Sequence, residues 1–340
     1  MIVQELVAPG RVAGGAVLQL RTRADPRPGP RDVLIEVTAC AVCRTDLQIA
    51  EGDLEARRLP IVPGHQIVGR IAGHGSEVDP SAYPLDSRVG VAWIASTCGS
   101  CRFCVLGREN LCAHAAFTGW DRDGGYAERV VARSDFTYVL PDGFDDLQAA
   151  PLLCGGTVGY RSLKVAGVDL DNASGVRLGL YGFGVSATYV IQIAVHAGCE
   201  VYVATRSPAE QERARRLGAV WTGAYADTPP VPLDAAITFA PSGDVVIAAL
   251  SALDRGGTVA VNAIHLDHVP DFDYQKLWWE RSIRSVANVT RRDVTEFLAL
   301  AARIPVVTQT ETFALRDANL ALRRLAEGSN SGAAVLQIER

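Results

Sequence analysis

The stretch LGLYGFGVSATYVIQIAVHAG, residues 178–198, decides the fold. It begins as an apolar strand that runs into glycines, and from residue 185 it has the periodicity of a helix that ends at a glycine. A glycine turn between a strand and a helix lets the backbone approach a pyrophosphate, which the free N–H groups of the helix N-terminus then bind. The stretch therefore predicts a nucleotide-binding βαβ unit; a tight turn without a ligand is the alternative.

The chain on either side continues the same alternation. Three further apolar runs are typical of buried strands, and two amphipathic segments, the first with a Ser cap and Pro at its first position, are typical of helices. The strands are expected at 199–206, 233–240 and 257–264, and the helices at 207–219 and 245–257. Strands that alternate with helices indicate an α/β fold with a doubly wound parallel sheet over residues 151–289.

The first 150 residues have a different texture, with short β-like runs separated by Gly and Pro. The clearest runs are 33–39, 67–73, 87–93 and 126–132. They predict a β-rich, partly closed domain with long loops. A helix and a final strand after residue 290 are expected to rejoin it, so that residues 1–150 and 290–340 form one domain.

Length and composition limit the class of protein. The 340 residues suggest about two domains, and the net charge of −5 without a basic block argues against a nucleic-acid or anionic-membrane partner. No apolar run reaches the ~18 residues of a membrane span. The first residues lack the layout of a signal peptide, so a cytoplasmic protein is expected.

Four of the eight cysteines lie in TCGSCRFCVLGRENLC, residues 97–112. Disulfides are rare in the cytosol, and Cys98, Cys101, Cys104 and Cys112 have a spacing that lets one loop place four sulfurs around one ion. Four thiolates fill the coordination shell of zinc, so the expected site is structural. A redox-active or incidentally cysteine-rich loop and an iron–sulfur cluster are the alternatives; the ferredoxin motif has a shorter last gap.

The end of the second strand bears on the choice of nucleotide. An acid that binds the ribose 2′-OH of NAD is usual here, but residues 204–207 read ATRS. With Arg206 and the hydroxyls of Thr205 and Ser207, and no carboxylate to repel a 2′-phosphate, NADP(H) is favoured over NAD(H).

Cys43, His65 and Cys154 are candidates for a second metal site. Each lies at an expected strand end or a glycine-bearing turn, where a side chain can point into a cleft. Two thiolates and an imidazole would leave one position of zinc open, which is a catalytic arrangement. Taken singly, a buried Cys is more often inert core and a lone His is more often simply hydrogen-bonded.

Taken together, the motifs resemble those of the zinc-dependent medium-chain alcohol dehydrogenases over nearly the whole chain. The resemblance rests on the cysteine lobe at 98–112, C-R-T-D at 43–46, G-H-Q at 64–66, Cys154 before a glycine pair and the turn at 179–187. It implies a groES-like catalytic domain and a Rossmann cofactor domain. It also implies two zinc ions per chain and hydride transfer between an alcohol and NAD(P), the activity of class EC 1.1.1.-.

The resemblance also implies roles for single residues. Cys43, His65 and Cys154 would hold the catalytic zinc, Asp46 would orient His65, and Thr45 would take the proton of the alcohol. Trp93 and Trp120 would line a narrow apolar pocket that suits primary aliphatic or aromatic alcohols. The cofactor would contact Arg44, Thr157, Gly179, Gly182, Phe183, Gly184, Val185, Thr205 and Arg206.

Three departures from the family pattern affect these expectations. Tyr181 replaces a glycine of the phosphate turn, Gln66 replaces a glutamate after the histidine, and Gln48 replaces a histidine at the end of the proton relay. The proton would then leave through the cofactor ribose. Within the enzyme class, a zinc-dependent polyol or ketone reductase is the alternative; outside it, a catalytically inactive cofactor-binding relative or a zinc-bearing regulatory protein. A homo-oligomer, a dimer or a tetramer, is expected from the resemblance.

Overall fold

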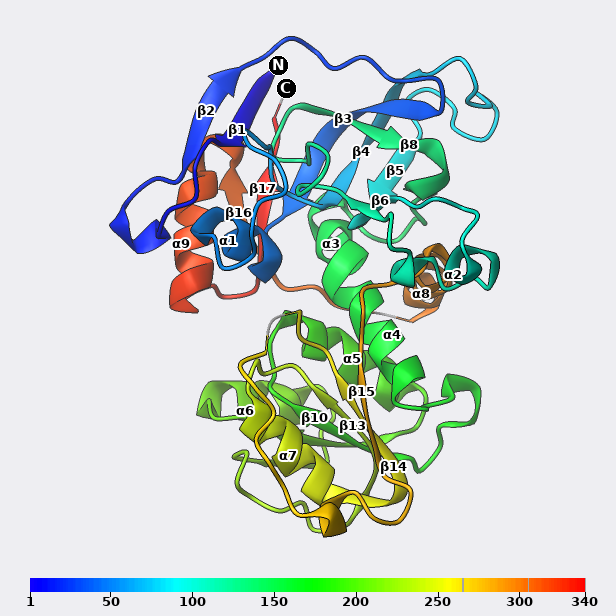
Figure 1. Cartoon of the computed structure of the whole chain (residues 1–340), viewed down its shortest axis with the longest axis vertical. Helices are drawn as coiled ribbons and strands as arrows, with labels where there is room; N and C mark the ends of the chain where they lie inside the picture. Colours follow the sequence, from blue (N-terminus) through cyan, green and yellow to red (C-terminus); the bar gives the residue numbers. More distant parts are fainter. Residues whose placement is uncertain (265, 305, 340) are drawn as a thin grey trace. The chain divides into compact units, whose positions relative to one another are not determined.

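The computed structural model describes residues 1–264, 266–304 and 306–339, which divide into two compact units (Figure 1). Unit 1 comprises Met1–Cys154, Asn288–Ala302 and the described chain from Val307 onward. Unit 2 comprises the described residues of Gly155–Ala287 and Arg303–Val306. None of the described helices is long and apolar enough to cross a membrane.

Unit 2 is built on a six-stranded sheet in which every neighbouring pair is parallel. In spatial order the strands are β12 (Trp221–Gly223), β11 (Glu200–Ala204), β10 (Arg177–Tyr181), β13 (Leu233–Thr238), β14 (Leu253–Val261) and β15 (Ser282–Ser285). The order reverses direction between β10 and β13, the point at which doubly wound sheets bind their ligands. The expected parallel, doubly wound sheet is confirmed.

The described residues of unit 2 form four helices: α4 (Thr157–Val165), α5 (Val185–His196), α6 (Pro208–Arg216) and α7 (Gly243–Ala252). Helix α5 packs on β11, and α7 packs on β13 and β14. These helices cover strands whose side chains are almost all buried, as in parallel sheets that are covered on both faces. The Ser207 cap of α6 accepts a hydrogen bond from the Glu210 N–H, as its sequence predicts.

Unit 1 contains a mostly antiparallel sheet of seven strands. Its path is β16 (Thr310–Ala314), β17 (Ala333–Gln337), β3 (Asp32–Ala41), β4 (Gln66–His74), β5 (Arg88–Val91) and β9 (Thr137–Val139), and β8 (Arg129–Arg133) pairs with β3. The C-terminal strand β17 runs antiparallel to β3, with Val335 opposite Ala41. Two small sheets complete the unit: β1 (Ile2–Leu6) with β2 (Leu18–Thr22), and β6 (Ile94–Ser96) with β7 (Ala116–Phe117).

The described helices of unit 1 range from four to 13 residues. They are α1 (Arg44–Glu51), α2 (Arg102–Val105), α3 (Asp146–Pro151), α9 (Ala318–Glu327) and α8 (Arg291–Arg303), whose last residue is assigned to unit 2. One apolar cluster, which runs from Val3 to Ile338, is the core of unit 1. Unit 2 has its own cluster around Tyr181, Leu233 and Val259. Each unit thus buries its own core.

Candidate functional site

Cys43, His65 and Cys154, which are far apart in sequence, come together in unit 1. Cys43 follows β3 as the N-cap of α1, and His65 precedes β4 directly after Gly64, whose φ is +94°. Cys154 lies in a π-helical turn, Leu152–Gly156, and not at a strand end. Such turns are frequent at functional sites. The Sγ atoms and a ring nitrogen of His65 all lie within 4.8 Å of one another.

Asp46 orients the His65 ring through its Nδ1 atom. Its Oδ1 lies 3.2 Å from Nδ1 of His65, and its Oδ2 accepts the backbone N–H of Cys43 at 2.8 Å. Nε2 of His65 is buried and has no hydrogen-bond partner among the described residues. A buried ring nitrogen without a partner, which points toward two sulfurs, fits a metal ligand, because the carboxylate sets the tautomer that leaves Nε2 free to bind.

The electrostatics of this group favour a cation. Burial alone would lower the pKa of His65, but the Asp46 carboxylate and the Cys43 sulfur raise it to about 10. The Cys154 thiol and His65 hold the pKa of Cys43 well below its usual value, whereas the neighbouring Cys43 and burial raise the pKa of Cys154. Negative charge therefore gathers on Cys43 and Asp46. A divalent ion could replace the protons that otherwise balance it, and three protein ligands would leave one position of that ion open.

The four cysteines of the 98–112 loop also converge. Sγ of Cys98 lies 3.9 Å from that of Cys104 and 3.5 Å from that of Cys112, and Cys101 lies 3.5 Å from Cys104. Four sulfurs placed tetrahedrally at ~2.3 Å from zinc would be about 3.8 Å apart. All four are free thiols, so the geometry fits a zinc site with no open position and excludes a disulfide framework in this structure.

Backbone donors support one of these thiolates. The N–H groups of Ser100 and Cys101 lower the pKa of Cys98 to about 6, and Cys101 N lies 3.3 Å from its sulfur. N–H groups that point at sulfur stabilise the deprotonated form, which is the form that binds metal. The lobe is thus arranged for a metal before any ion binds.

Thr45 and Arg44 begin helix α1, directly after Cys43. The Thr45 side chain is buried, and its hydroxyl lies 3.8 Å from Sγ of Cys43. Arg44 is exposed. The helix start thus places a hydroxyl beside a candidate zinc ligand and a cation at the surface.

Trp93 and Trp120 belong to an aromatic cluster next to His65. Their ring centroids are 6.0 Å apart in a stacked arrangement, and Trp93 lies 5.9 Å from the His65 ring. Phe117 contacts both indoles, at 4.6 and 5.6 Å, and the Arg57 guanidinium lies 3.9 Å from the Trp120 ring. Sequence reasoning did not find Phe117 or Arg57; the run AAFTGW holds an aromatic pair at a spacing of three, but nothing in it indicates what the pair contacts.

In unit 2 the glycine turn follows β10. Gly182 has φ of +92°, and a Cβ there would lie 3.0 Å from the backbone nitrogen of Ala240. Gly184 is the N-cap of α5; it makes no side-chain cap, and a Cβ there would meet open space. The first N–H groups of α5, from Val185 on, have no side-chain cap, and such free groups at a helix start can bind a phosphate. Tyr181, where the family often has glycine, is buried in the core of unit 2.

Two other residues that were expected to contact the cofactor, Gly179 and Phe183, are buried inside unit 2. Gly179 lies inside β10, where a Cβ would come within 2.6 Å of Leu233. The Phe183 side chain is buried under Arg213, which also donates to the Phe183 carbonyl at 2.7 Å.

No acid was expected at the end of β11, but the structure places one, Glu210, next to Thr205. Thr205 follows β11 and is buried, and its hydroxyl donates to Oε2 of Glu210 at 2.5 Å. Arg206 is exposed beside the ring of Tyr225, whose hydroxyl it contacts. The sequence pattern missed Glu210 because it lies one helical turn beyond the usual position. Thr157 is buried at the start of α4.

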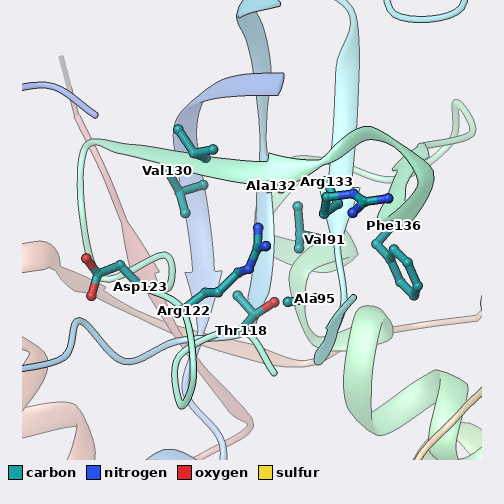
Figure 2. Close-up of a pocket in the computed structure, with 10 residues that line it drawn as sticks. Val91, Ala95, Thr118, Arg122, Asp123, Val130, Ala132, Arg133 and Phe136 are labelled. Atoms are coloured by element: carbon teal, nitrogen blue, oxygen red, sulfur yellow. The ribbon is translucent and has the colours of Figure 1, made fainter. Parts of the chain in front are cut away.

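A small pocket in unit 1 lies apart from this chemistry. Figure 2 shows it beneath β8, with the Arg122 side chain pointing up from the preceding loop and Phe136 at one end. Half of the described residues that line it are aliphatic, three are charged, and none is a candidate zinc ligand.

Comparisons with known proteins identify the family of this chain. The family described as "Alcohol dehydrogenase GroES-like domain" matches residues 29–142, and the one described as "Zinc-binding dehydrogenase" matches residues 187–303. A curated relative, the "Probable alcohol dehydrogenase AdhA" of Mycobacterium tuberculosis, is 46% identical over 97% of this chain and 95% of its own length. An alcohol dehydrogenase of Geobacillus stearothermophilus is 31% identical over 95% of this chain and 96% of its own.

A solved structure has the same fold. The acetophenone reductase of Geotrichum candidum, in complex with NAD, superposes with a TM-score of 0.85 at 26% identity and covers 99% of this chain and 96% of its own. The expected groES-like and Rossmann fold classes are thereby confirmed.

Proposed function

The chain belongs to the zinc-containing medium-chain alcohol dehydrogenase family, and from that premise we propose which residues carry its chemistry and which substrate and nucleotide it prefers. It is a zinc-dependent enzyme that interconverts alcohols and carbonyl compounds with NAD(P). The observation that carries the proposal is the convergence of Cys43, His65 and Cys154 around a buried His65 nitrogen without a partner.

In the proposed mechanism these three residues hold the catalytic zinc, and the cysteine lobe holds a structural one. When bound, the catalytic zinc supplies Lewis acidity at a substrate oxygen. Asp46 keeps His65 in the tautomer whose Nε2 is free, through its contact with Nδ1. The Thr45 hydroxyl, beside Cys43, accepts the proton that the alcohol loses while it passes its own hydroxyl proton outward toward solvent, and the reverse reaction runs the same two transfers backward.

We propose that the substrate is a primary aliphatic or aromatic alcohol, or the matching aldehyde. The support is the cluster of Trp93, Phe117 and Trp120 beside His65, which presents flat apolar surfaces and suits a polyol poorly. The relative titled acetophenone reductase makes aromatic ketones the second class to test.

We propose NADP(H) as the preferred nucleotide, because Arg206 is exposed at the end of β11 and could pair with a 2′-phosphate. One observation favours NAD(H) instead: the Glu210 carboxylate lies at the same strand end. In our proposal Glu210 is occupied by the Thr205 hydroxyl and does not contact the ribose. The ratio of kcat/KM for NADPH and NADH decides between the two.

The proposal is tested by counting zinc and following turnover. Protein purified without chelator should contain two zinc ions per chain, and should oxidise NADPH faster than NADH with aromatic and aliphatic aldehydes. Cys154→Ala should retain one zinc and lose turnover by at least about 10³-fold, because it removes a ligand of the catalytic ion but none of the lobe. One zinc per wild-type chain, or full activity in Cys154→Ala, would refute the assignment of the catalytic site.

A further inference from the structure

We propose that Tyr126 is a positioning residue of the catalytic zinc site, which acts by fixing the carboxylate that orients His65. The inference rests on the proposed function, because it requires zinc on Cys43, His65 and Cys154. The sequence pattern marks Tyr126 only as the start of a β-like run, and its contact with the site spans 80 residues of chain.

Asp46 accepts four hydrogen bonds, two on each oxygen. Oδ1 lies 3.2 Å from both the Gly64 N–H and Nδ1 of His65. Oδ2 accepts the Cys43 N–H at 2.8 Å and the Tyr126 hydroxyl at 3.2 Å. Asp46 is 0% exposed, so these four donors replace the water that a carboxylate would otherwise bind. Three of the donors belong to the two segments that carry zinc ligands, and Tyr126 is the fourth.

Tyr126 is itself held in one place. Its side chain is 0% exposed, and its backbone N–H donates to Pro63 while its carbonyl accepts from Gln4. The ring packs over Gly64, where a Cβ would come within 2.3 Å of Cδ1 of the tyrosine. The residue before His65 therefore has to be small for this ring to reach Asp46. The segment that presents His65 and the ring that supports its carboxylate fit each other directly.

Loss of the hydroxyl has a defined physical consequence. Oδ2 would keep only the Cys43 N–H, inside a site with no water contact, so one lone-pair direction of a buried carboxylate would be empty. The carboxylate could then turn about its Cβ–Cγ bond, and the angle at which it holds the His65 ring would vary. A ligand ring with a less defined orientation releases its metal more readily.

The test is the rate at which Tyr126→Phe releases its catalytic zinc to an excess of a chromophoric chelator. Substitution of a residue that contacts a metal ligand commonly lowers metal affinity by about 10–100-fold. Tyr126 contacts Asp46, which in turn contacts the ligand His65, so its effect should be smaller. We expect Tyr126→Phe to release the catalytic zinc about 3- to 10-fold faster than the wild type. The lobe zinc is an internal control and should leave at the wild-type rate. The Cys154→Ala protein, which should hold only the lobe zinc, identifies the two kinetic phases.

Tyr83→Phe is the matched control variant. It also removes a tyrosine hydroxyl in unit 1, but that hydroxyl donates to the Ser134 carbonyl at 2.6 Å and not to Asp46. It should leave both release phases unchanged. If Tyr126→Phe also releases zinc at the wild-type rate, or if the lobe zinc accelerates equally, the positioning role is overturned.

A double-mutant cycle separates action through Asp46 from a general loosening. In an Asp46→Asn background, where the carboxylate is already lost, Tyr126→Phe should change the release rate by less than about twofold. The same several-fold effect in both backgrounds would overturn the inference while leaving the proposed function intact. A wild-type chain with a single zinc would overturn both.

Discussion

At the scale of single residues, Thr45 provides the sharpest test of the chemistry. Its buried hydroxyl lies at the start of α1 beside Cys43, and in the proposed mechanism it takes the proton of the substrate oxygen. Thr45→Ala should lower kcat by at least about 10²-fold, and Thr45→Ser, which keeps the hydroxyl, should recover most of it. Steady-state kinetics checks this, with zinc content measured on the same samples.

Equal activity in the alanine and serine variants would show that the proton leaves by another route. Loss of zinc in Thr45→Ala would instead assign the residue to holding the site together. Because Gln48, one turn along α1, does not titrate near neutrality, no side chain at that position can substitute for the hydroxyl as a base.

At this scale, sequence alone can predict which residues lie close together only where they are neighbours in the chain. Cys43, Thr45 and Asp46 share one short motif, so their meeting at the start of α1 follows from the spacing alone. Tyr126 and Phe117 could not be found in that way. Both are aromatic residues in β-like stretches, and what distinguishes them is a partner more than twenty residues away in the chain.

At the scale of elements, long buried strands and capped helices were predicted well, and short or irregular ones were not. β12 and β15 have three and four residues at the two edges of the unit 2 sheet, too few for a periodic pattern. The π-helical turn that presents Cys154 was also missed, because the pattern of apolar residues does not distinguish a local i→i+5 turn from an ordinary bend.

The cysteine lobe and helix α8 are joined by hydrogen bonds between Glu109 and Arg291. Glu109, buried within the 3-10 turn Glu109–Leu111, accepts the backbone N–H of Arg291 at 3.0 Å and its Nε at 3.3 Å. A carboxylate at a helix N-terminus is favourable because the free N–H groups carry partial positive charge. The cysteine lobe therefore also stabilises the start of α8, in addition to bringing four sulfurs together.

Glu109→Gln should lower the free energy of unfolding by about 1–3 kcal/mol, since it weakens charged hydrogen bonds to a buried group. Zinc should remain at two ions per chain, because no lobe sulfur is touched. Calorimetric unfolding of this variant is compared with Glu212→Gln, which alters an exposed pair with Arg215 and should cost less than about 0.5 kcal/mol. Equal stability of the two variants would mean that the lobe does not support α8.

At the scale of the whole molecule, the candidate zinc ligands and the glycine turn lie in different units. All seven candidate zinc ligands belong to unit 1, and Gly182, Gly184 and Arg206 belong to unit 2. Each unit has its own apolar core, so the nucleotide turn does not need the zinc ions to fold. The geometry of the turn comes instead from local causes, the positive φ of Gly182 and the cap at Gly184.

Removal of both zinc ions by a chelator should therefore abolish turnover while NAD(P)H still binds, with a Kd within about tenfold of the holoenzyme value. Nucleotide fluorescence checks this on protein whose metal content is measured. Gly182→Ala is the reciprocal variant: a Cβ at φ of +92° and 3.0 Å from Ala240 N should weaken nucleotide binding, yet both zinc ions should stay. Loss of nucleotide binding in the zinc-free protein would show that unit 1 metals shape the turn, and that the two chemistries are coupled in folding as well as in catalysis.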